Sequence, residues 1–215
     1  MTHTNTWHQR QRSKHREDLL AAAKDVLVRR GMLNVKITEL CAAAGVSRVT
    51  FYKNFQSMDE LILELQIDIL ERMTAQVGAA DGKERSGRER LKDMLEAWVD
   101  YAGRQPDDMK FILLFDVHFD AAASDSALHS RYSEFVRTKI ERNFLVDPLE
   151  AGIADGSLAP GLEPLETSRF IFTAMMAVLQ KRSLRPVATT PNLASDTQMG
   201  ERFVKMILEF VSPGV

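Results

Sequence analysis

Apolar residues in the first third of the chain recur three or four positions apart, which is the spacing of one helix face. Residues 16–30 form one such pattern, which ends at Gly31, and residues 37–44 form a second one, which ends at Gly45. A glycine adopts a left-handed backbone conformation at little cost, so the chain can reverse at Gly45 within a few residues. The pattern predicts a supporting helix, a connection and the first helix of a helix-turn-helix motif.

The segment after this turn predicts the second helix of the motif, with two chemically different faces. The Ser47 hydroxyl is placed to cap its first turn, and Phe51 and Phe55 lie four residues apart on the face that packs inward. The opposite face carries Arg48, Val49, Tyr52 and Lys53. Cationic, methyl-bearing and hydroxyl-bearing side chains on one short helix suit the major groove of DNA.

The rest of the chain also has the pattern of amphipathic helices. Capping boxes, in which a serine is followed three residues later by Glu or Gln, open helices after Ser57, Ser86 and Ser195. Residues 124–156 predict one long helix that Pro148 kinks. No stretch shows sustained alternation of apolar and polar residues, so the chain is predicted to be all α.

The charge distribution is more informative than the composition, which is ordinary for a soluble protein at 45% apolar and 27% charged residues. The net charge is -2, but residues 1–56 hold ten cations and four anions and therefore carry +6, which leaves -8 for the remainder. A basic head on an acidic body is expected where only the head meets a polyanion. Residues 10–16 could reach a phosphate or a minor groove, whereas residues 1–9 are predicted to be a frayed terminus.

Several chemistries find no support in the sequence. The single cysteine, Cys41, cannot form a disulfide or a thiolate zinc site within the chain, and its place on an apolar face predicts a packing role rather than redox sensing. The five histidines lack ligand spacing, so no metal, cofactor or catalytic residue is predicted. The longest nearly apolar run, residues 170–179, is about half of a membrane span, and the protein is predicted to be soluble and cytoplasmic, without a membrane partner.

Four segments in consistent order and spacing carry a family resemblance: residues 19–23, 40–47, 50–55 and 60–61. With them the N-terminal third resembles the TetR family of bacterial transcriptional regulators. The resemblance implies a three-helix DNA-binding head over residues 10–60, joined to a helical-bundle effector-binding and dimerisation domain over residues 61–215.

The resemblance also implies which residues face the operator: Thr38, Ser47, Arg48, Val49, Thr50, Tyr52 and Lys53. Arg48 is the best candidate for reading a base, because its guanidinium fork fits the O6 and N7 atoms of guanine, and Val49 can touch a thymine methyl group. The other five suit phosphates, which fix the register of the protein on DNA. The chain departs from many relatives at Val49, Asn54 and Met58.

A homodimer and a small-molecule effector of unknown identity are further implications of the resemblance. Candidates for an effector pocket are Trp98, Tyr101, Phe111, Phe115, His118, Phe119, Phe172 and Met176. Candidates for the dimer interface are Phe170, Met175, Phe203, Ile207 and Phe210. Each pocket candidate, taken alone, fits a plain hydrophobic core better than a pocket, and the sequence separates the interface candidates from such a core only weakly.

The sequence therefore favours a TetR-like regulator, most often a repressor in this family, that binds a palindromic double-stranded DNA operator as a homodimer. The effector would release the DNA by favouring a conformation in which the helix after Ser57 swings and separates the two recognition helices. Two alternatives stay open. One is a helical enzyme, for which no paired acid and base or phosphate-binding loop is found, and the other is a protein-interaction adaptor with a helix-turn-helix head.

Overall fold

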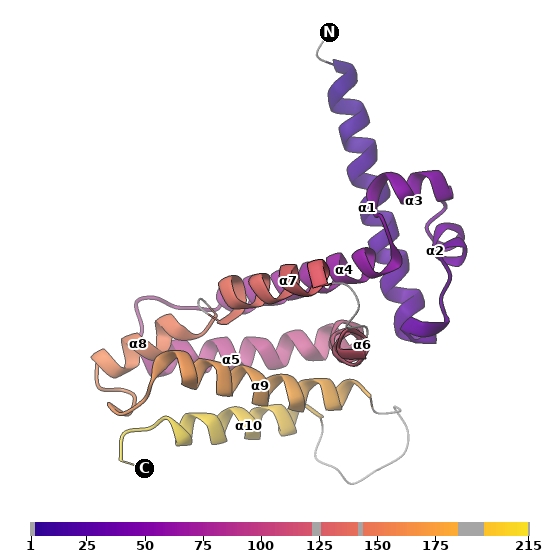
Figure 1. The fold of residues 1–215 in the computed structure, drawn as a ribbon. Coiled ribbons are helices and arrows are strands. Elements are labelled where there is room, and N and C mark those ends of the chain that lie inside the picture. Colours follow the sequence, from indigo (N-terminus) through magenta and orange to yellow (C-terminus); the bar gives the residue numbers. More distant parts are fainter. Residues whose placement is uncertain (1–2, 122–125, 142–143, 185–195, 215) are drawn as a thin grey trace. The chain divides into compact units, whose positions relative to one another are not determined.

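The computed structural model describes residues 3–121, 126–141, 144–184 and 196–214, and every regular element among them is a helix (Figure 1). The all-α prediction is therefore confirmed. The elements are α1 (His3–Arg30), the 3-10 helix η1 (Met32–Asn34), α2 (Ile37–Ala43), α3 (Arg48–Asn54), α4 (Met58–Gly78), α5 (Gly87–Arg104), α6 (Pro106–Ala121), α7 (Ser126–Phe135), the π-helix η2 (Val136–Glu141), α8 (Val146–Ala154), α9 (Pro164–Ser183) and α10 (Asp196–Phe210).

Contacts group the chain into two compact units. The first unit holds residues 1–68 and 110–129, and the second holds residues 69–109 and 130–215. The division passes through α4, so this helix begins in the first unit and ends in the second. The predicted domain boundary between residues 60 and 61 stays a prediction.

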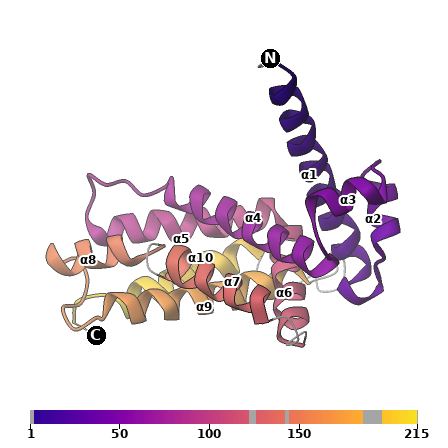
Figure 2. The same cartoon turned by 45° about the horizontal axis from the view of Figure 1, so that its top comes forward.

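The first unit is built around a small core under the helix-turn-helix motif. α1 contacts both α2 and α3, which lie beside its C-terminal half in both views (Figures 1 and 2). The periodic apolar residues of the three helices, among them Leu19, Leu27, Leu40 and Phe51, are completely buried between them. The spacing that predicts these helices thus also supplies the core that holds them together.

The second unit is organised around α5, which packs against α8, α9 and α10 (Figure 2). Its inward residues Leu95 and Trp98 are completely buried. At its first residue, Gly87, a Cβ atom would lie 2.0 Å from the backbone nitrogen of Gly152 in α8. The two helices therefore approach to near backbone contact, which only glycine allows.

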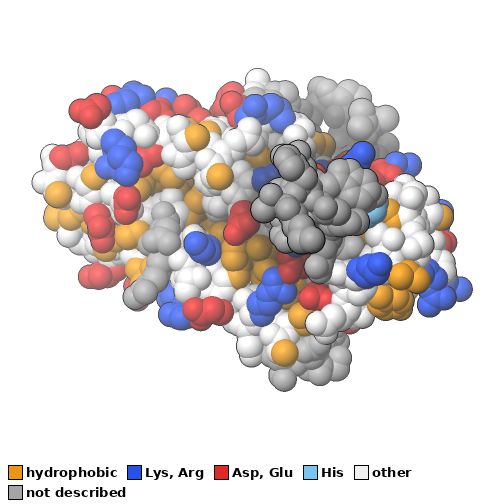
Figure 3. Space-filling model, turned by 90° about the horizontal axis from the view of Figure 1, so that it is seen from above, with side chains coloured by type: hydrophobic (Ala, Val, Ile, Leu, Met, Phe, Trp, Pro, Cys, Tyr) orange, Lys and Arg blue, Asp and Glu red, His pale blue; other side chains and the backbone are white. Residues whose placement is uncertain are grey.

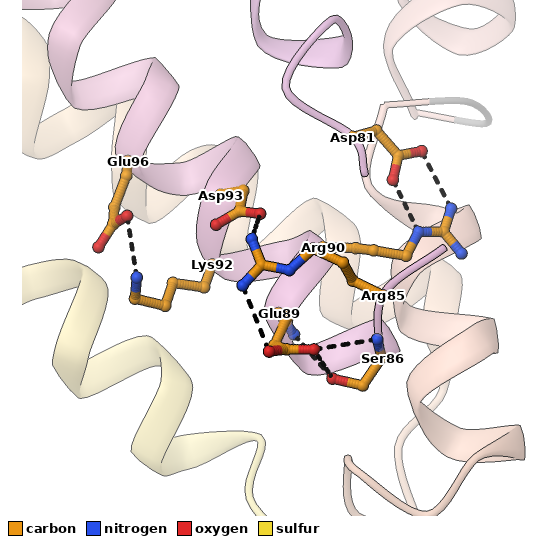
Figure 4. A network of polar contacts seen from close by, with 8 residues as sticks. All are labelled: Asp81, Arg85, Ser86, Glu89, Arg90, Lys92, Asp93 and Glu96. Carbon is orange, nitrogen blue, oxygen red and sulfur yellow. Dashed lines mark hydrogen bonds and ion pairs between the residues drawn. The ribbon is translucent and has the colours of Figure 1, made fainter. Parts of the chain in front are cut away.

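Of the predicted capping boxes, the one at Ser86 is complete, whereas at Ser57 only the serine cap forms and the Glu60 carboxylate accepts from the Gln56 N–H instead. The Glu60 N–H donates to Ser57 Oγ over 3.1 Å at the start of α4. At the start of α5, the Ser86 N–H donates to the Glu89 carboxylate over 3.2 Å, and the Glu89 N–H donates back to Ser86 Oγ over 3.4 Å (Figure 4). The third predicted box, at Ser195, lies outside the described residues.

Two predictions about helix extent are wrong. α1 begins at His3 rather than near Arg16, and residues from His3 onward belong to the helix rather than to a frayed terminus. No glycine or proline interrupts residues 3–30, so a helix nucleated by the packed part can propagate backward, first through the Gln, Arg and Lys residues of positions 9–14.

The single long helix predicted for residues 124–156 is also wrong. The described part of this segment holds α7, the π-helix η2 and a separate helix, α8. Pro148 is the third residue of α8, where a missing N–H costs no intrahelical hydrogen bond. Proline therefore marks the beginning of a helix here instead of kinking one.

Candidate nucleic-acid interface

The turn of the helix-turn-helix motif has the geometry that Gly45 predicts. Gly45 has a φ angle of 65°, in the left-handed region that disfavours side chains. The Val46 N–H donates to the Cys41 carbonyl over 2.9 Å, and the Gly45 N–H donates to the Ala42 carbonyl over 3.3 Å. These two bonds close the end of α2 and turn the chain toward α3.

α3 is capped at its start and anchored on its inner side. The Thr50 N–H donates to Ser47 Oγ over 3.0 Å, as the sequence predicts for this cap. Asn54 Nδ2 donates to the Thr50 carbonyl over 2.8 Å near the end of the helix. Phe51 and Phe55 are 0% and 2% exposed, with ring centroids 5.8 Å apart. Their burial fixes the rotation of α3 and therefore decides which side chains face outward.

The outward side of α3 presents most of the residues predicted to meet DNA. Arg48, Val49, Tyr52 and Lys53 are exposed, with Val49 at 65% and Tyr52 at 50%. The edge of the Phe51 ring meets the Tyr52 ring at a centroid distance of 5.3 Å, which supports the phenol on the buried core. α3 therefore displays two cations, a phenol and a branched aliphatic group on one surface.

Three of the predicted residues lie at the edge of this surface. Thr38 on α2 and Ser47 are exposed, while Thr50 is half-buried. The hydroxyls of Ser47 and Thr50 lie 3.0 Å apart and share a hydrogen bond. All seven predicted DNA-binding residues thus belong to one unit, and their contact with DNA stays a prediction.

Ion pairs brace the helices of the motif. The Lys36 N–H donates to Glu39 over 2.9 Å, and Arg30 of α1 donates to the other oxygen of the same carboxylate over 2.8 Å. The Lys36 N–H first, and then the Arg30 guanidinium, hold the pKa of Glu39 below its ordinary value. This carboxylate therefore ties the beginning of α2 to the end of α1.

Arg16 has a structural contact that the sequence does not reveal. Its guanidinium pairs with Glu64 of α4 and lies 5.6 Å from the centroid of the Phe55 ring. Arg16 therefore joins α1 to α4. The space-filling view shows Lys and Arg side chains around hydrophobic ones at the end that carries α2 and α3 (Figure 3).

The predicted effector-pocket residues fall into both units. Phe111, Phe115, His118 and Phe119 belong to the first unit, and Trp98, Tyr101, Phe172 and Met176 belong to the second. In the first unit, Phe115 stacks on Phe119 at 4.7 Å, and His118 Nε2 lies 3.5 Å from Asp59. His118 also lines a cavity of about 440 Å³ whose other walls are Gly31, Met32, Leu33, Asn34, Leu113, Leu114 and Val117.

In the second unit the structure adds a residue that the prediction missed. The Phe144 ring meets Trp98 edge-on at 4.9 Å, and the Phe172 ring lies 5.3 Å from Trp98. We call these three residues the aromatic cluster. Phe144 also lines a cavity of about 400 Å³, bounded by Glu71, Thr74, Ala75, Gly78, Asp81, Met94, Lys139, Asp147 and Pro148. No spacing rule links Phe144 to Trp98, because they lie on different segments joined only by folding.

The hydroxyl of Tyr101 has an internal partner. Its O–H donates over 2.5 Å to the carboxylate of Asp108, which is completely buried. Arg72 of α4 lies 3.4 Å from the same oxygen. These contacts join α4, α5 and the first turn of α6, so the polar end of Tyr101 has a structural role.

The predicted dimer-interface residues divide into buried and exposed ones. Met175 and Ile207 are buried in the core of the second unit, and Phe203 is half-buried. Phe170 on α9 and Phe210 on α10 are 58% and 52% exposed, with ring centroids 5.6 Å apart. Two exposed methionines of α10 that the prediction omits, Met199 and Met206, increase the apolar surface of this helix.

Other features limit the chemistry of the described residues. Cys41 is buried, as predicted, and burial raises the pKa of its thiol, which keeps the thiol unreactive. No cluster of three or more metal-ligating side chains occurs in the described part of the chain. Within that same part, no helix combines the length and apolarity needed to cross a membrane.

The helix-turn-helix motif, with its exposed cationic helix on a buried aromatic anchor, defines a DNA-binding protein of the regulatory class. Comparison with known proteins agrees. Residues 19–65 match the model of the bacterial regulatory proteins of the tetR family. The segment that holds the helix-turn-helix motif is therefore similar to the corresponding part of TetR-family transcriptional regulators.

Individual relatives match beyond residues 19–65. The HTH-type transcriptional repressor KstR2 of Mycolicibacterium smegmatis is 23% identical over 199 residues, which are 92% of this chain and 91% of that protein. The HTH-type transcriptional activator FasR of the same organism is 30% identical over 105 residues, which are 49% of this chain and 47% of that protein. The crystal structure of the regulator FadR from Bacillus subtilis, in complex with stearoyl-CoA, has a TM-score of 0.70 at 14% identity and covers 91% of this chain and 98% of its own.

Proposed function

We propose that this regulator is a repressor that binds a palindromic operator as a homodimer and releases it when a small-molecule effector binds. The observation that carries the proposal is the outward face of α3, where Arg48, Tyr52 and Lys53 are exposed while Phe51 and Phe55 anchor the helix. Repression is supported by KstR2, the repressor that matches over nearly the whole chain.

The chemistry of each exposed side chain suggests its role on DNA. Arg48 can donate two hydrogen bonds to guanine, and Val49 can contact a thymine methyl group. Tyr52 and Lys53 fit phosphates, as do Thr38, Ser47 and Thr50 at the edge of the surface. In this arrangement α3 would read the bases and the neighbouring residues would contact the phosphates, so each subunit would bind one half-site of the operator.

The apolar surface of α9 and α10 supports a homodimer. Phe170, Met206 and Phe210 are each more than half exposed. Burying such large side chains against a second copy removes apolar area from water, worth about 25 cal/mol per Å². A two-fold axis there would let each subunit contribute the same surface. In such a dimer, half-sites lie about one helical turn of DNA apart, roughly 34–36 Å.

The aromatic cluster and the cavity beside it support an effector site in the second unit. The cavity of about 400 Å³ falls in the size range of small-molecule pockets. The complex of FadR with stearoyl-CoA shows that a relative with this fold takes a ligand with a long apolar chain. An apolar or amphipathic effector therefore fits this chain.

α4 offers a direct route from effector to DNA. The cavity is lined by Glu71, Thr74, Ala75 and Gly78, all on α4, and the same helix begins next to α3 at Met58. A ligand that prefers one position of α4 shifts the population toward that position. The distance between the α3 helices of the two subunits would then no longer match the spacing of the two half-sites on DNA.

The test is selection of bound DNA from a random library by the full-length protein. We expect a palindromic consensus, and in a screen of acyl-CoA thioesters as candidate effectors we expect at least one to release that DNA. Recovery of an asymmetric site would contradict the dimer, and failure to enrich any sequence would contradict the proposed function.

A further inference from the structure

A cavity lies inside the first unit, between η1 and α6. Its volume is about 440 Å³, and its walls include Met32 and Leu33 of η1 and Leu113, Leu114 and Val117 of α6. Both elements belong to the unit that carries the helix-turn-helix motif. Because η1 connects α1 to α2, the cavity lies beside the motif, and it shares none of its described lining residues with the effector cavity of the second unit.

The lining of this cavity is uncharged. It contains no Asp, Glu, Lys or Arg among the described residues, and its polar side chains are Asn34 and His118. Nε2 of His118 is shielded from solvent and lies 3.5 Å from Asp59 of α4. A nitrogen that opened into a cavity of this size would be accessible to water, so this nitrogen does not open into it. The lining therefore offers apolar surface and the Asn34 amide, but no charged group that could pair with an ion.

Two large apolar side chains of the lining are exposed to solvent. Leu33 is 86% exposed and Val117 is 68% exposed. They come from different elements, η1 and α6, and both border the same cavity. A single exposed apolar residue is ordinary on a protein surface, whereas a hollow lined by apolar groups is typical of a ligand site. A molecule in the cavity would remove both side chains from water, which is favourable in proportion to the apolar area covered.

The size of the cavity favours a small molecule as its occupant. Ligand pockets measure about 300–1,000 Å³, and an apolar cavity of about 150 Å³ holds benzene. The cavity between η1 and α6, at about 440 Å³, therefore has room for roughly two or three rings. A stable protein interface takes roughly 20–30 residues from each side, whereas this lining is confined to residues 31–34 and one stretch of α6.

We propose that the cavity between η1 and α6 binds an uncharged, apolar small molecule of roughly two or three rings. The inference goes beyond the proposed function, which places the effector in the second unit. An ionic ligand is disfavoured, because it would lose its hydration without gaining a partner of opposite charge in the lining. The bound molecule would contact both η1 and α6, and so would connect the segment that leads into the motif with α6.

The first test compares two fluorescent probes with the same skeleton. N-phenyl-1-naphthylamine is uncharged, and 1-anilinonaphthalene-8-sulfonate adds a sulfonate. Both are titrated into full-length Ala75→Trp, in which a large side chain at an exposed position fills the effector cavity of the second unit. We expect the uncharged probe to bind about tenfold or more tightly than the sulfonate. Equal affinities, or no binding of the uncharged probe, would overturn the inference.

The second test places charges in the lining. The double substitution Leu33→Asp and Val117→Asp, made in the Ala75→Trp protein, changes two exposed side chains and should leave the fold intact. It should weaken binding of the uncharged probe about tenfold or more, because the probe would bury carboxylates. The matched control is Leu165→Asp with Leu184→Asp, which changes two exposed apolar residues in the second unit and should leave probe affinity unchanged. Equal probe affinity in the lining variant and in this control would contradict the site.

Light scattering tests an alternative occupant, which is a second copy of the chain. The double substitution Leu33→Asp and Val117→Asp should keep the molar mass of the wild-type protein. A halved molar mass would show that a second copy covers the cavity, which would overturn the proposal of a small-molecule site.

These tests separate the inference from the proposed function. Probe binding is measured without DNA and with the effector cavity filled, so it can be observed even where no operator is found. Conversely, a palindromic operator together with no probe binding to Ala75→Trp would support the proposed function and overturn the inference.

Discussion

Arg48 and Lys53 both lie on the exposed side of α3, but their predicted roles on DNA differ. Single substitutions can distinguish the two roles. Arg48→Ala should weaken operator binding about 10- to 100-fold and relax the base preference at one position, because a bidentate contact to a base is lost. Lys53→Ala should weaken binding to all sequences and lower the slope of log affinity against log salt by about one, because one phosphate contact is lost. Both effects can be measured by fluorescence anisotropy over a salt series.

The control for these variants is Lys205→Ala, which removes one cation from an exposed position of α10 in the second unit. It should leave operator affinity unchanged at fixed salt. If Arg48→Ala and Lys53→Ala behave like this control, the assignment of the α3 surface is wrong.

The sequence predicts the burial of individual residues better than it predicts their interaction partners. Phe51 and Phe55 are buried as their spacing predicts, and Gly45 turns the chain as predicted. Tyr101 is a predicted pocket residue, but the partner of its hydroxyl, Asp108, is known only from the structure. Spacing reports which face of a helix is apolar, whereas pairing partners depend on which helices meet.

At the scale of an element, the beginning of α5 is held by a polar network that joins it to the loop before it (Figure 4). Arg90 makes two hydrogen bonds with Asp81, over 2.7 and 3.0 Å, and both side chains are only about a tenth exposed. The hydrogen bond from Arg90 is the main reason that the pKa of Asp81 is lowered. Arg90→Ala should therefore destabilise the protein by about 3 kcal/mol near neutral pH, because it leaves a mostly buried carboxylate unpaired.

The pH dependence of this pair follows from the direction of the pKa shift. A lowered pKa in the folded state gives stability that is complete above about 3.9, the pKa of an unperturbed Asp side chain, and is lost as pH falls through the folded-state pKa. In denaturant titrations, the difference between wild type and Arg90→Ala should thus shrink in acid. The control is Arg85→Ala, whose pairs with Glu89 and Asp93 are more exposed to solvent and should contribute less to stability than the Arg90 pair. Equal losses in both variants would show that burial does not distinguish the two pairs.

Helix boundaries show which features of a helix can be predicted from the local sequence. The predicted caps at Ser57 and Ser86 open α4 and α5, because a cap needs only a few neighbouring residues. The break within residues 124–156 was not predicted, because the apolar spacing continues through η2 and α8. The packing of α8 against α5 is a contact between distant segments, which spacing along the chain does not report.

At the scale of the whole molecule, the exposed apolar surface of α9 and α10 leads to a prediction about dimer formation. The double substitution Met206→Asp and Phe210→Asp should convert the dimer into a monomer, because it places two charges where apolar side chains would be buried. Molar mass from light scattering after gel filtration measures the change. The monomer should also lose operator affinity, since it cannot occupy two half-sites at once.

The control for assembly is Val117→Asp, which alters an exposed apolar residue of α6 in the first unit. This variant should keep the mass of the wild-type protein. A double variant that stays dimeric would place the interface elsewhere, and a wild-type protein that is monomeric at micromolar concentration would contradict the proposed homodimer.

The sequence by itself determined the helix-turn-helix segment Ile37–Asn54, because its turn, cap and anchoring residues act over short distances along the chain. It also determined the all-α class and the concentration of positive charge near the motif. Only the tertiary structure decided that Phe144 meets Trp98, that Asp108 receives the Tyr101 hydroxyl, and that η1 and α6 line one cavity. The physical reason is that these contacts join segments far apart in sequence, so they exist only once the helices have packed.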